Sequence, residues 1–187
     1  MIVSPWPTSH DSWLDPRLEI RPSPISGRGT FATQPIPAGQ IVILWVHRIL
    51  TKEETALAPP GLLLERSDHK WIWQPPDDPN APDNLLNHSC NPNLWMADEV
   101  SLATTRAIDP NEELTSDYAL FELEEDWLCK FLCNCGQPNC RRTITGRDWM
   151  RPELQLRYAG HFHPEIQKRI ASGQLLSRHR EQNSRDR

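Results

Sequence analysis

Three cysteines lie within eight residues, in the run CNCGQPNC at 133–140. Gly136 lets the chain turn tightly between them, so the three thiolates can converge on one metal ion. Structural zinc takes four tetrahedral ligands, usually sulfur or imidazole, so a fourth ligand must come from elsewhere in the chain. The remaining thiols are Cys90 and Cys129. Spacing slightly favours Cys129, four residues before Cys133, whereas Cys90 would tie this run to the body of the domain.

Two simpler interpretations of the thiols compete with a metal site. One is a set of small buried cysteines without metal, and the other is cysteine-protease chemistry from His88 and Cys90. The pattern CxCG-x3-C rarely arises by chance, and no third group that would orient His88 is evident. We therefore predict a metal site whose fourth ligand is Cys90 or Cys129.

The charge balance excludes several classes of partner. The formal net charge of the 187 residues is −5, which argues against binding to phosphate backbones and suits a basic peptide better. A zinc-knuckle nucleic-acid binder would need basic and aromatic residues around the cysteines, but residues 122–126 read ELEED. No apolar run approaches the roughly 18 residues of a membrane span. We expect no direct nucleic-acid binding and no membrane binding, and the sequence leaves the oligomeric state open.

The first residues, MIVSPWPTSHDSW, lack the basic and apolar regions of a signal peptide. We therefore expect the chain inside the cell, in the cytoplasm or, in a eukaryote, the nucleus. Cysteines in that compartment bind metals or react more often than they form disulfides.

Prolines divide the chain into short segments. There are 18 prolines and only 8 glycines, in runs such as IPAG, PPDDPNAPD and DPNE, which is typical of short strands joined by turns. Several intervening segments are rich in β-branched or aromatic residues. The expected strands are 18–21, 30–33, 40–46, 70–74, 94–97, 100–106 and 113–116. This pattern predicts a mostly-β core.

Helices are expected mainly near the C-terminal end. Residues 51–54, TKEE, form a capping box that would open one short early helix. A second helical segment is expected over 148–157 with Asp148 as its cap, and a third over 164–172 with Pro164 in its first turn.

Four motifs in a fixed order resemble a SET domain followed by a post-SET zinc module. They are GRGTFA at 27–32 with IPAG at 36–39, NHSCNPN at 87–93, EELTSDY at 112–118, and CxCG-x3-CR at 133–141. Each motif is weak alone, but the ordered set is specific to this family of protein-lysine methyltransferases. The resemblance covers about 18–142, and the stretch that follows is similar to extensions on small stand-alone bacterial SET proteins.

The resemblance implies a SET fold of several small twisted sheets. In that fold the segment after NHSC threads through a loop of the preceding chain, a pseudoknot of a kind that is rare in proteins, and helices follow at the C-terminal end. The expected divisions are an N-terminal segment over 1–17, a SET domain over 18–119, a post-SET zinc module over 120–142, a helical extension over 143–173 and a disordered tail over 174–187. The tail has almost no apolar residue after Leu176 and cannot fold by itself.

The resemblance also implies which thiol completes the metal site. In this family the fourth zinc ligand is the cysteine of the NHSC segment, which selects Cys90 over Cys129. The implied zinc ligands are Cys90, Cys133, Cys135 and Cys140.

The implied activity is transfer of a methyl group from S-adenosylmethionine to the side-chain amine of a lysine in a basic protein or peptide. The family pattern places the backbone of Arg28 and Gly29 along the cofactor, where glycine permits close approach. Asn87 and His88 would hold its amino-acid and adenine ends, and Phe131 would pack on the adenine.

Tyr118 is the implied catalytic residue, with its hydroxyl beside the cofactor's transferring methyl group. Trp71 and Trp73 fall where the family has a strand lining the lysine channel, and core packing suits either equally. Two positions depart from the family. Ser116 stands where Tyr or Phe usually helps to set how many methyl groups are added, and Asn84 stands where an arginine is usual. These departures leave open a catalytically weak SET-fold binding module that keeps zinc and cofactor.

Overall fold

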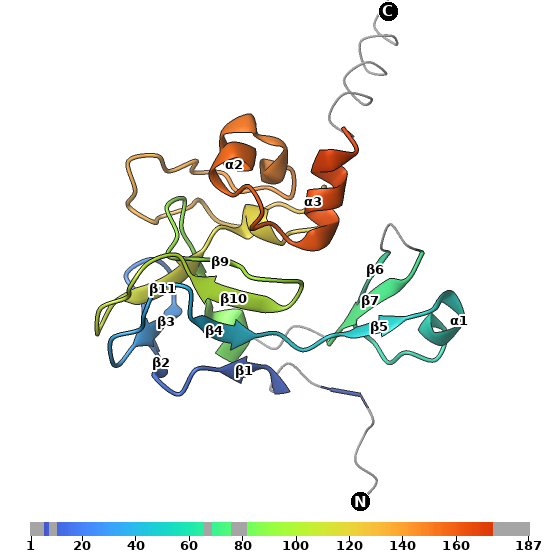
Figure 1. The fold of residues 1–187 in the computed structure, drawn as a ribbon, viewed down its shortest axis with the longest axis horizontal. Coiled ribbons are helices and arrows are strands. Elements are labelled where there is room, and N and C mark those ends of the chain that lie inside the picture. The colour runs from blue at the N-terminus through green and yellow to red at the C-terminus, as the bar shows by residue number, and fades with distance from the viewer. Residues whose placement is uncertain (1–5, 8–10, 66–68, 76–81, 174–187) are drawn as a thin grey trace, which may run out of the picture.

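Three small β-sheets and a set of C-terminal helices make up the described chain (Figure 1). The computed structural model describes residues 6–7, 11–65, 69–75 and 82–173. The predicted disordered tail, 174–187, lies outside the described residues. No helix of the described chain is long and apolar enough to cross a membrane.

The strand pairing confirms the mostly-β prediction. The first sheet has the order β1-β4-β10-β9 and contains β1 (Trp13–Leu14), β4 (Ile41–Leu44), β9 (Leu94–Met96) and β10 (Ser101–Thr104). The second has the order β2-β3-β11-β8 and contains β2 (Leu18–Pro22), β3 (Arg28–Ala32), β8 (Asn87–His88) and β11 (Glu113–Ser116). The third has the order β5-β7-β6 and contains β5 (Arg48–Leu50), β6 (Leu62–Glu65) and β7 (Trp71–Gln74).

All seven predicted strands are present, with ends that differ from the predicted ones by a few residues. The sequence pattern did not predict four further strands, β1, β5, β6 and β8. Two of these have only two residues, and β6 reads LLLE without the alternation that marks a strand with one buried face.

The parallel pair β8 and β11 is the feature of the second sheet that positions the site. Asn87 lies opposite Thr115 and His88 opposite Ser116. Parallel neighbours cannot be joined by a tight hairpin. The intervening chain, 89–112, adds β9 and β10 to the first sheet and then returns as β11 between β3 and β8. This crossing agrees with the predicted threaded SET fold.

One hydrophobic core joins the first two sheets to the C-terminal helices. Leu102 and Leu114 from the sheets share it with Trp149, Phe162 and Ile166, and none of these five is more than 2% exposed. The C-terminal segment therefore contributes to the main core of the molecule.

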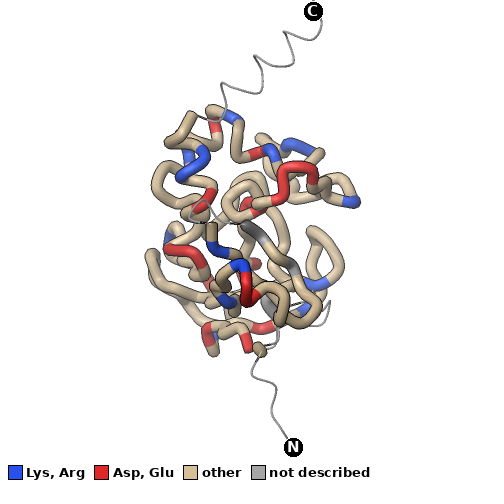
Figure 2. Tube along the Cα trace, turned by 90° about the vertical axis from the view of Figure 1, so that its right-hand side faces the viewer, with Lys and Arg blue, Asp and Glu red and all other residues tan. Residues whose placement is uncertain are grey.

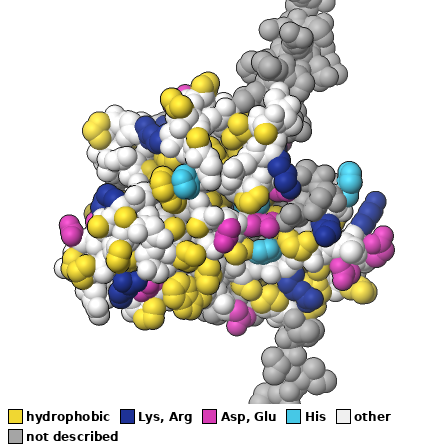
Figure 3. All heavy atoms as spheres, viewed as in Figure 1, with side chains coloured by type: hydrophobic (Ala, Val, Ile, Leu, Met, Phe, Trp, Pro, Cys, Tyr) yellow, Lys and Arg dark blue, Asp and Glu magenta, His cyan; other side chains and the backbone are white. Residues whose placement is uncertain are grey.

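Some apolar side chains of the first sheet remain partly exposed. Trp13, Ile41 and Leu44 are 37–41% exposed. In the view of Figure 3, apolar side chains gather along the lower side, where β1 and β4 lie in Figure 1.

The early helix, α1 (Lys52–Thr55), confirms the predicted capping box. The Thr51 hydroxyl accepts a hydrogen bond from the backbone N–H of Glu54, and the Glu54 carboxylate accepts one from the N–H of Thr51. A 3-10 turn, η2 (Pro82–Leu85), precedes β8, and a second, η3 (Tyr118–Leu120), follows β11.

The predicted cap at Asp148 is wrong. Asp148 begins a 3-10 turn, η4 (Asp148–Met150), and α2 (Pro152–Arg157) starts separately after Arg151. The Asp148 carboxylate is buried and accepts a hydrogen bond from Arg141 at 2.9 Å. The carboxylate that would have capped a helix is therefore used in a tertiary ion pair. The last helix, α3 (Pro164–Ala171), has proline in its first turn as predicted.

Candidate functional site: a pocket beside four cysteines

Four cysteine thiols converge where β8 ends. The sulfur atoms of Cys90, Cys133, Cys135 and Cys140 all lie within 4.8 Å of one another, and those of Cys90 and Cys133 are 4.0 Å apart. A tetrahedron of thiolates around zinc has sulfur atoms about 3.8 Å apart, given metal–sulfur bonds of about 2.3 Å. The donor set and its spacing therefore fit one tetrahedral metal ion. Cys129 is not in this group, as the family resemblance predicts and spacing alone does not.

Two N–H groups point at the sulfur of Cys90. The backbone N–H of Arg141 donates to it at 3.3 Å, and the Nε2 atom of His88 lies 3.3 Å away. Without a cation, burial raises the pKa of the Cys90 thiol to about 11. A bound metal ion reverses that balance because it stabilises the thiolate directly.

The position of the proton on His88 follows from its other partner. Its Nδ1 atom accepts a hydrogen bond from the backbone N–H of Tyr118 at 3.2 Å. Burial lowers the pKa of His88 to about 4, so the ring is neutral at neutral pH and its one proton is on Nε2. His88 therefore donates to Cys90 while it accepts from Tyr118, and it connects the cysteine cluster to the segment after β11.

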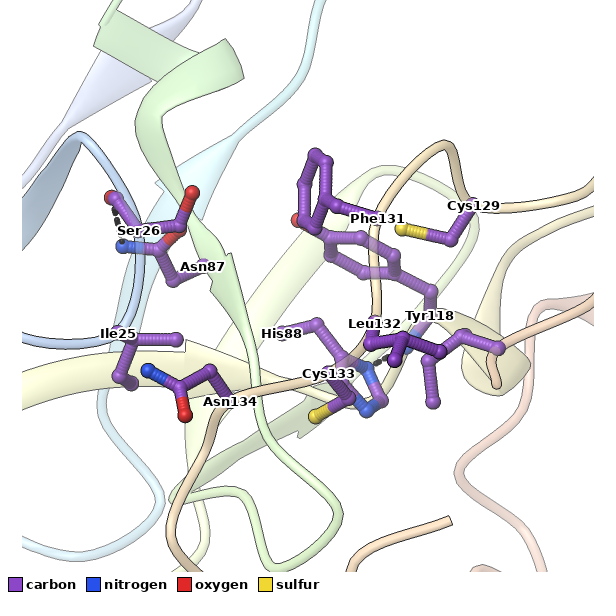
Figure 4. A pocket seen from close by; sticks show the side chains of 11 residues that line it. Ile25, Ser26, Asn87, His88, Tyr118, Cys129, Phe131, Leu132, Cys133 and Asn134 are labelled. Atoms are coloured by element: carbon purple, nitrogen blue, oxygen red, sulfur yellow. Dashed lines mark hydrogen bonds between the residues drawn. The ribbon is translucent and has the colours of Figure 1, made fainter. Parts of the chain in front are cut away.

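A pocket opens on the other side of these residues (Figure 4). It brings together four residues that the resemblance predicts for cofactor binding or catalysis: Asn87, His88, Tyr118 and Phe131. It is also lined by Ile25, Ser26, Cys129, Leu132, Cys133, Asn134 and Ile144. The pocket lies between the turn before β3, the parallel pair, and the segment that carries the cysteines.

Asn87 is held at the pocket by hydrogen bonds from its amide nitrogen. That Nδ2 atom lies 3.1 Å from the carbonyl oxygens of Ser26 and Arg28 and 2.8 Å from a carboxylate oxygen of Glu113. The amide oxygen is the acceptor that remains for a ligand.

The pocket lining does not include Arg28 and Gly29, which the resemblance places along the cofactor. In the structure, the absence of a side chain at Gly29 serves a neighbouring contact. A Cβ atom there would lie 2.1 Å from the carboxylate of Glu113 and 2.9 Å from the amide nitrogen of Asn87. The glycine makes room for the Asn87–Glu113 contact.

Tyr118 is the first residue of η3 and is partly buried at the pocket. Its hydroxyl donates to the carbonyl oxygen of Leu86 at 3.0 Å, and its ring centroid lies 5.0–6.0 Å from those of His88, Phe121 and Trp127. Burial, with a smaller contribution from Cys129 and Cys133, raises its pKa to about 12. The group is therefore a neutral hydroxyl donor in an aromatic surrounding at neutral pH.

Other predicted residues lie at different depths. Phe131 lines the pocket and is 60% exposed, so its aromatic ring is available to pack against a ligand there. Ser116 is fully buried, and its hydroxyl has no hydrogen-bond partner among the described residues. Trp73 is 1% exposed, packs edge-on against Trp6 and donates to the carbonyl of Pro59, which is a structural role in the third sheet.

Sequence reasoning missed the residues that hold the site residues in place. Glu113 fixes Asn87, and Arg141 contacts both Cys90 and the carboxylate of Asp117. A signal was present, because Asp117 lies inside the SDY motif and Arg141 directly follows Cys140. Leu132 and Asn134 could also have been found, since both neighbour Cys133.

Comparisons with known proteins agree with the geometry. Residues 27–119 match the family described as SET domain. The chain is 31% identical over 143 residues to the human protein "Histone-lysine N-methyltransferase SETD1B", a match that covers 68% of this chain and 7% of that protein. "Histone-lysine N-methyltransferase SETD1" of Drosophila melanogaster is 31% identical over 144 residues, covering 68% and 8%. "Histone-lysine N-methyltransferase ATX2" of Arabidopsis thaliana is 28% identical over 144 residues, covering 68% and 13%, so the chain spans a small part of each relative's length.

We expect one metal ion per chain, bound through Cys90. Cys90→Ala should release the metal and lower the melting temperature, because structural metal binding contributes directly to folding free energy. Cys129→Ser is the matched control, since it removes a thiol outside the cluster. Metal analysis of the purified variants checks this, and loss of metal in Cys129→Ser with retention in Cys90→Ala would overturn the ligand set.

Proposed function

The chain belongs to the SET-domain family, and from that premise we propose that it is a protein-lysine methyltransferase that uses S-adenosylmethionine and carries one structural zinc ion. The observation that carries the proposal is the parallel β8–β11 pair, which brings Asn87, His88 and Tyr118 to one pocket. Relatives named histone-lysine N-methyltransferases support a protein or peptide lysine as the acceptor. Because the chain spans 7–13% of the relatives' lengths, its substrate has to be established on this chain itself.

The cofactor supplies an electrophilic methyl group on a sulfonium, which is transferred by in-line displacement. In our proposal the amide oxygen of Asn87 accepts from the cofactor's ammonium group, and the backbone of His88 contacts the adenine. Phe131 covers the adenine and loses exposure on binding. Gly29 acts indirectly, because it leaves room for the carboxylate that orients Asn87.

The acceptor lysine must react as its neutral amine, whose pKa in water is about 10.4. An apolar, aromatic channel lowers that pKa because it disfavours the cation. Phe121 and Trp127, beside Tyr118, supply such surroundings. The Tyr118 hydroxyl would then orient the reacting groups and favour the transition state.

Zinc is the metal that best suits four thiolates at this spacing. We assign residues 120–142 to a post-SET module on this basis. Leu132, Cys133 and Asn134 line the pocket while Cys133 also belongs to the cluster, so the metal would hold one wall of the cofactor site.

The electrostatic balance favours a basic peptide as substrate. The net charge is −5, and acidic and basic residues are interspersed along the described chain in the view of Figure 2. The proposed catalytic tyrosine and three of the proposed cofactor residues share one pocket, which favours an active enzyme over the catalytically weak binding module.

Asn87→Ala should weaken S-adenosylmethionine binding roughly tenfold, because one or two hydrogen bonds are lost. Asn91→Ala is the control, an exposed asparagine of the same motif that does not line the pocket. Isothermal calorimetry reads both affinities. A wild-type protein that gives no heat at millimolar cofactor would refute cofactor binding altogether.

Tyr118→Phe should reduce methylation by about 100-fold or more while leaving cofactor affinity nearly unchanged, because the hydroxyl acts chiefly in the transition state. Turnover is measured on a peptide array with labelled cofactor, then on the best peptide in solution. If the tyrosine is only structural, the variant will instead lose about 1 kcal/mol of stability and keep its rate per folded molecule.

Ser116→Tyr should shift the products toward lower methylation, because a phenol at this buried position would crowd a dimethylated amine. Ser116→Ala is the control: it removes a hydroxyl that has no partner among the described residues and should leave both stability and products unchanged. Mass spectrometry of an accepted peptide gives the product distribution. An unaltered distribution in a folded Ser116→Tyr protein would show that other residues shape the pocket.

A further inference from the structure

A buried ion cluster lies directly behind Tyr118. Its centre is the carboxylate of Asp117, which is fully buried. Arg141 donates to both oxygens of that carboxylate, at 2.6 and 2.7 Å, and uses its Nε atom to donate to Asp148 at 2.9 Å. The Arg141 side chain is 7% exposed, so this is a desolvated, bidentate ion pair.

The C-terminal segment supplies a further hydrogen bond to the same carboxylate. Tyr158, the C-cap residue directly after α2, is 4% exposed, and its hydroxyl donates to Asp117 at 3.1 Å. Burial and the charge of Asp117 raise the pKa of Tyr158 well above its usual value, which keeps the donor proton in place. The C-terminal segment thus contributes two of the groups around Arg141 and Asp117, namely the carboxylate of Asp148 and the hydroxyl of Tyr158.

Asp117 passes this constraint to Tyr118 through the backbone. Its carboxylate accepts the N–H of Ala119 at 3.1 Å and so caps η3, the turn that begins with Tyr118. The N–H of Tyr118 donates to His88, and the hydroxyl of Tyr118 donates to Leu86. The orientation of the Tyr118 ring therefore depends on where the carboxylate of Asp117 is held.

The chemistry of the cluster argues for a role in geometry. Apolar residues of similar volume are often at least as stabilising as a buried ion pair, because two charges must be desolvated. A planar bidentate guanidinium, however, fixes both the position and the plane of a carboxylate, which an apolar contact does not. The cysteine cluster also restrains Arg141, because the residue follows Cys140 and its N–H donates to Cys90.

We propose that Arg141 and Tyr158 are positioning residues for Tyr118, acting through Asp117, so that residues 143–173 complete the catalytic site. The proposal rests on the proposed function in so far as Tyr118 acts in catalysis. It assigns to the C-terminal segment a role in turnover that its distance in sequence from the SET motifs does not suggest.

The first test removes one hydroxyl. Tyr158→Phe should lower kcat about three- to tenfold, with KM for S-adenosylmethionine and metal content unchanged, because only the position of Tyr118 is affected. Gln167→Ala is the matched control: it removes a hydrogen bond to Phe162 in the same C-terminal segment, away from Asp117. Equal kcat losses in both variants would overturn the proposal, since they would report general loosening of the segment.

The second test separates geometry from charge. Arg141→Lys keeps the charge but cannot form the bidentate pair, and we expect it to lower kcat by about tenfold or more. Arg147→Lys is its control, because Arg147 pairs with Asp126 at the exposed surface. An Arg141→Lys protein with full metal content and wild-type kcat would overturn the role of Arg141.

Hydrogen exchange tests the proposal without turnover. Peptides covering 117–121 should exchange faster in Tyr158→Phe than in wild type or Gln167→Ala, since the cap on Ala119 loosens. Unchanged exchange there would refute the positioning role. If the wild type methylates no peptide while exchange changes as expected, the proposed enzymatic function fails and the structural coupling stands.

Discussion

The parallel pairing of β8 with β11 is the constraint on which the site depends. Asn87 and His88 face Thr115 and Ser116 in register, so the residues that follow each strand are brought together. Beyond β8 the chain reaches Cys90, and beyond β11 it reaches Tyr118. A shift of one residue in this register would turn every side chain of the pair to the opposite face. Pocket, cysteine cluster and tyrosine are thus set by one short pairing, which the threaded chain and the flanking strand β3 hold in place.

Polar groups are buried at high density around this pairing, and nearly all have partners. Burying a polar group without a hydrogen bond is costly. Each of these hydrogen bonds therefore satisfies a buried polar atom and also fixes the orientation of its side chain. Glu113 orients Asn87, His88 joins Cys90 to Tyr118, and Arg141 holds Asp117. Among the described residues, the buried side-chain atoms without a partner are the hydroxyl of Ser116 and the indole nitrogen of Trp149. By the family resemblance, Ser116 is one of two positions where the chain departs from its family, and an unpartnered small residue there agrees with a space that usually holds a ring.

The metal-binding and catalytic residues could be predicted from the sequence, because they occur in motifs whose spacing is characteristic of the ligand or reaction. Spacing slightly favoured Cys129 as the fourth ligand, whereas the family resemblance selected Cys90, and the structure groups Cys90 with the other three thiols. Features that depend on tertiary contacts could not be predicted from the sequence pattern. Asp148 looks like a helix cap in sequence, but its carboxylate pairs with the largely buried Arg141, seven residues earlier in the chain. Strand β8 was missed for a similar reason, since two residues carry no periodicity and only their partner strand makes them a strand.

The two walls of the pocket share the cysteine cluster but differ in how closely they are joined to the main core. The wall formed by Leu132, Cys133 and Asn134 buries little apolar surface, because Leu132 and Phe131 are both 60% exposed, and its local cluster consists mainly of cysteines. Metal coordination would supply the folding free energy that the core does not supply there. Tyr118, on the facing wall, packs against the same cysteine cluster, whereas Ala119 and Leu120, which follow it, belong to the main core that the C-terminal segment shares. Arg141 lies where the two systems meet, since it contacts a thiol on one side and two buried carboxylates on the other. Loss of a bound metal would therefore loosen the cofactor wall, and it would reach Tyr118 both through its packing on the cysteine cluster and through Arg141 and His88.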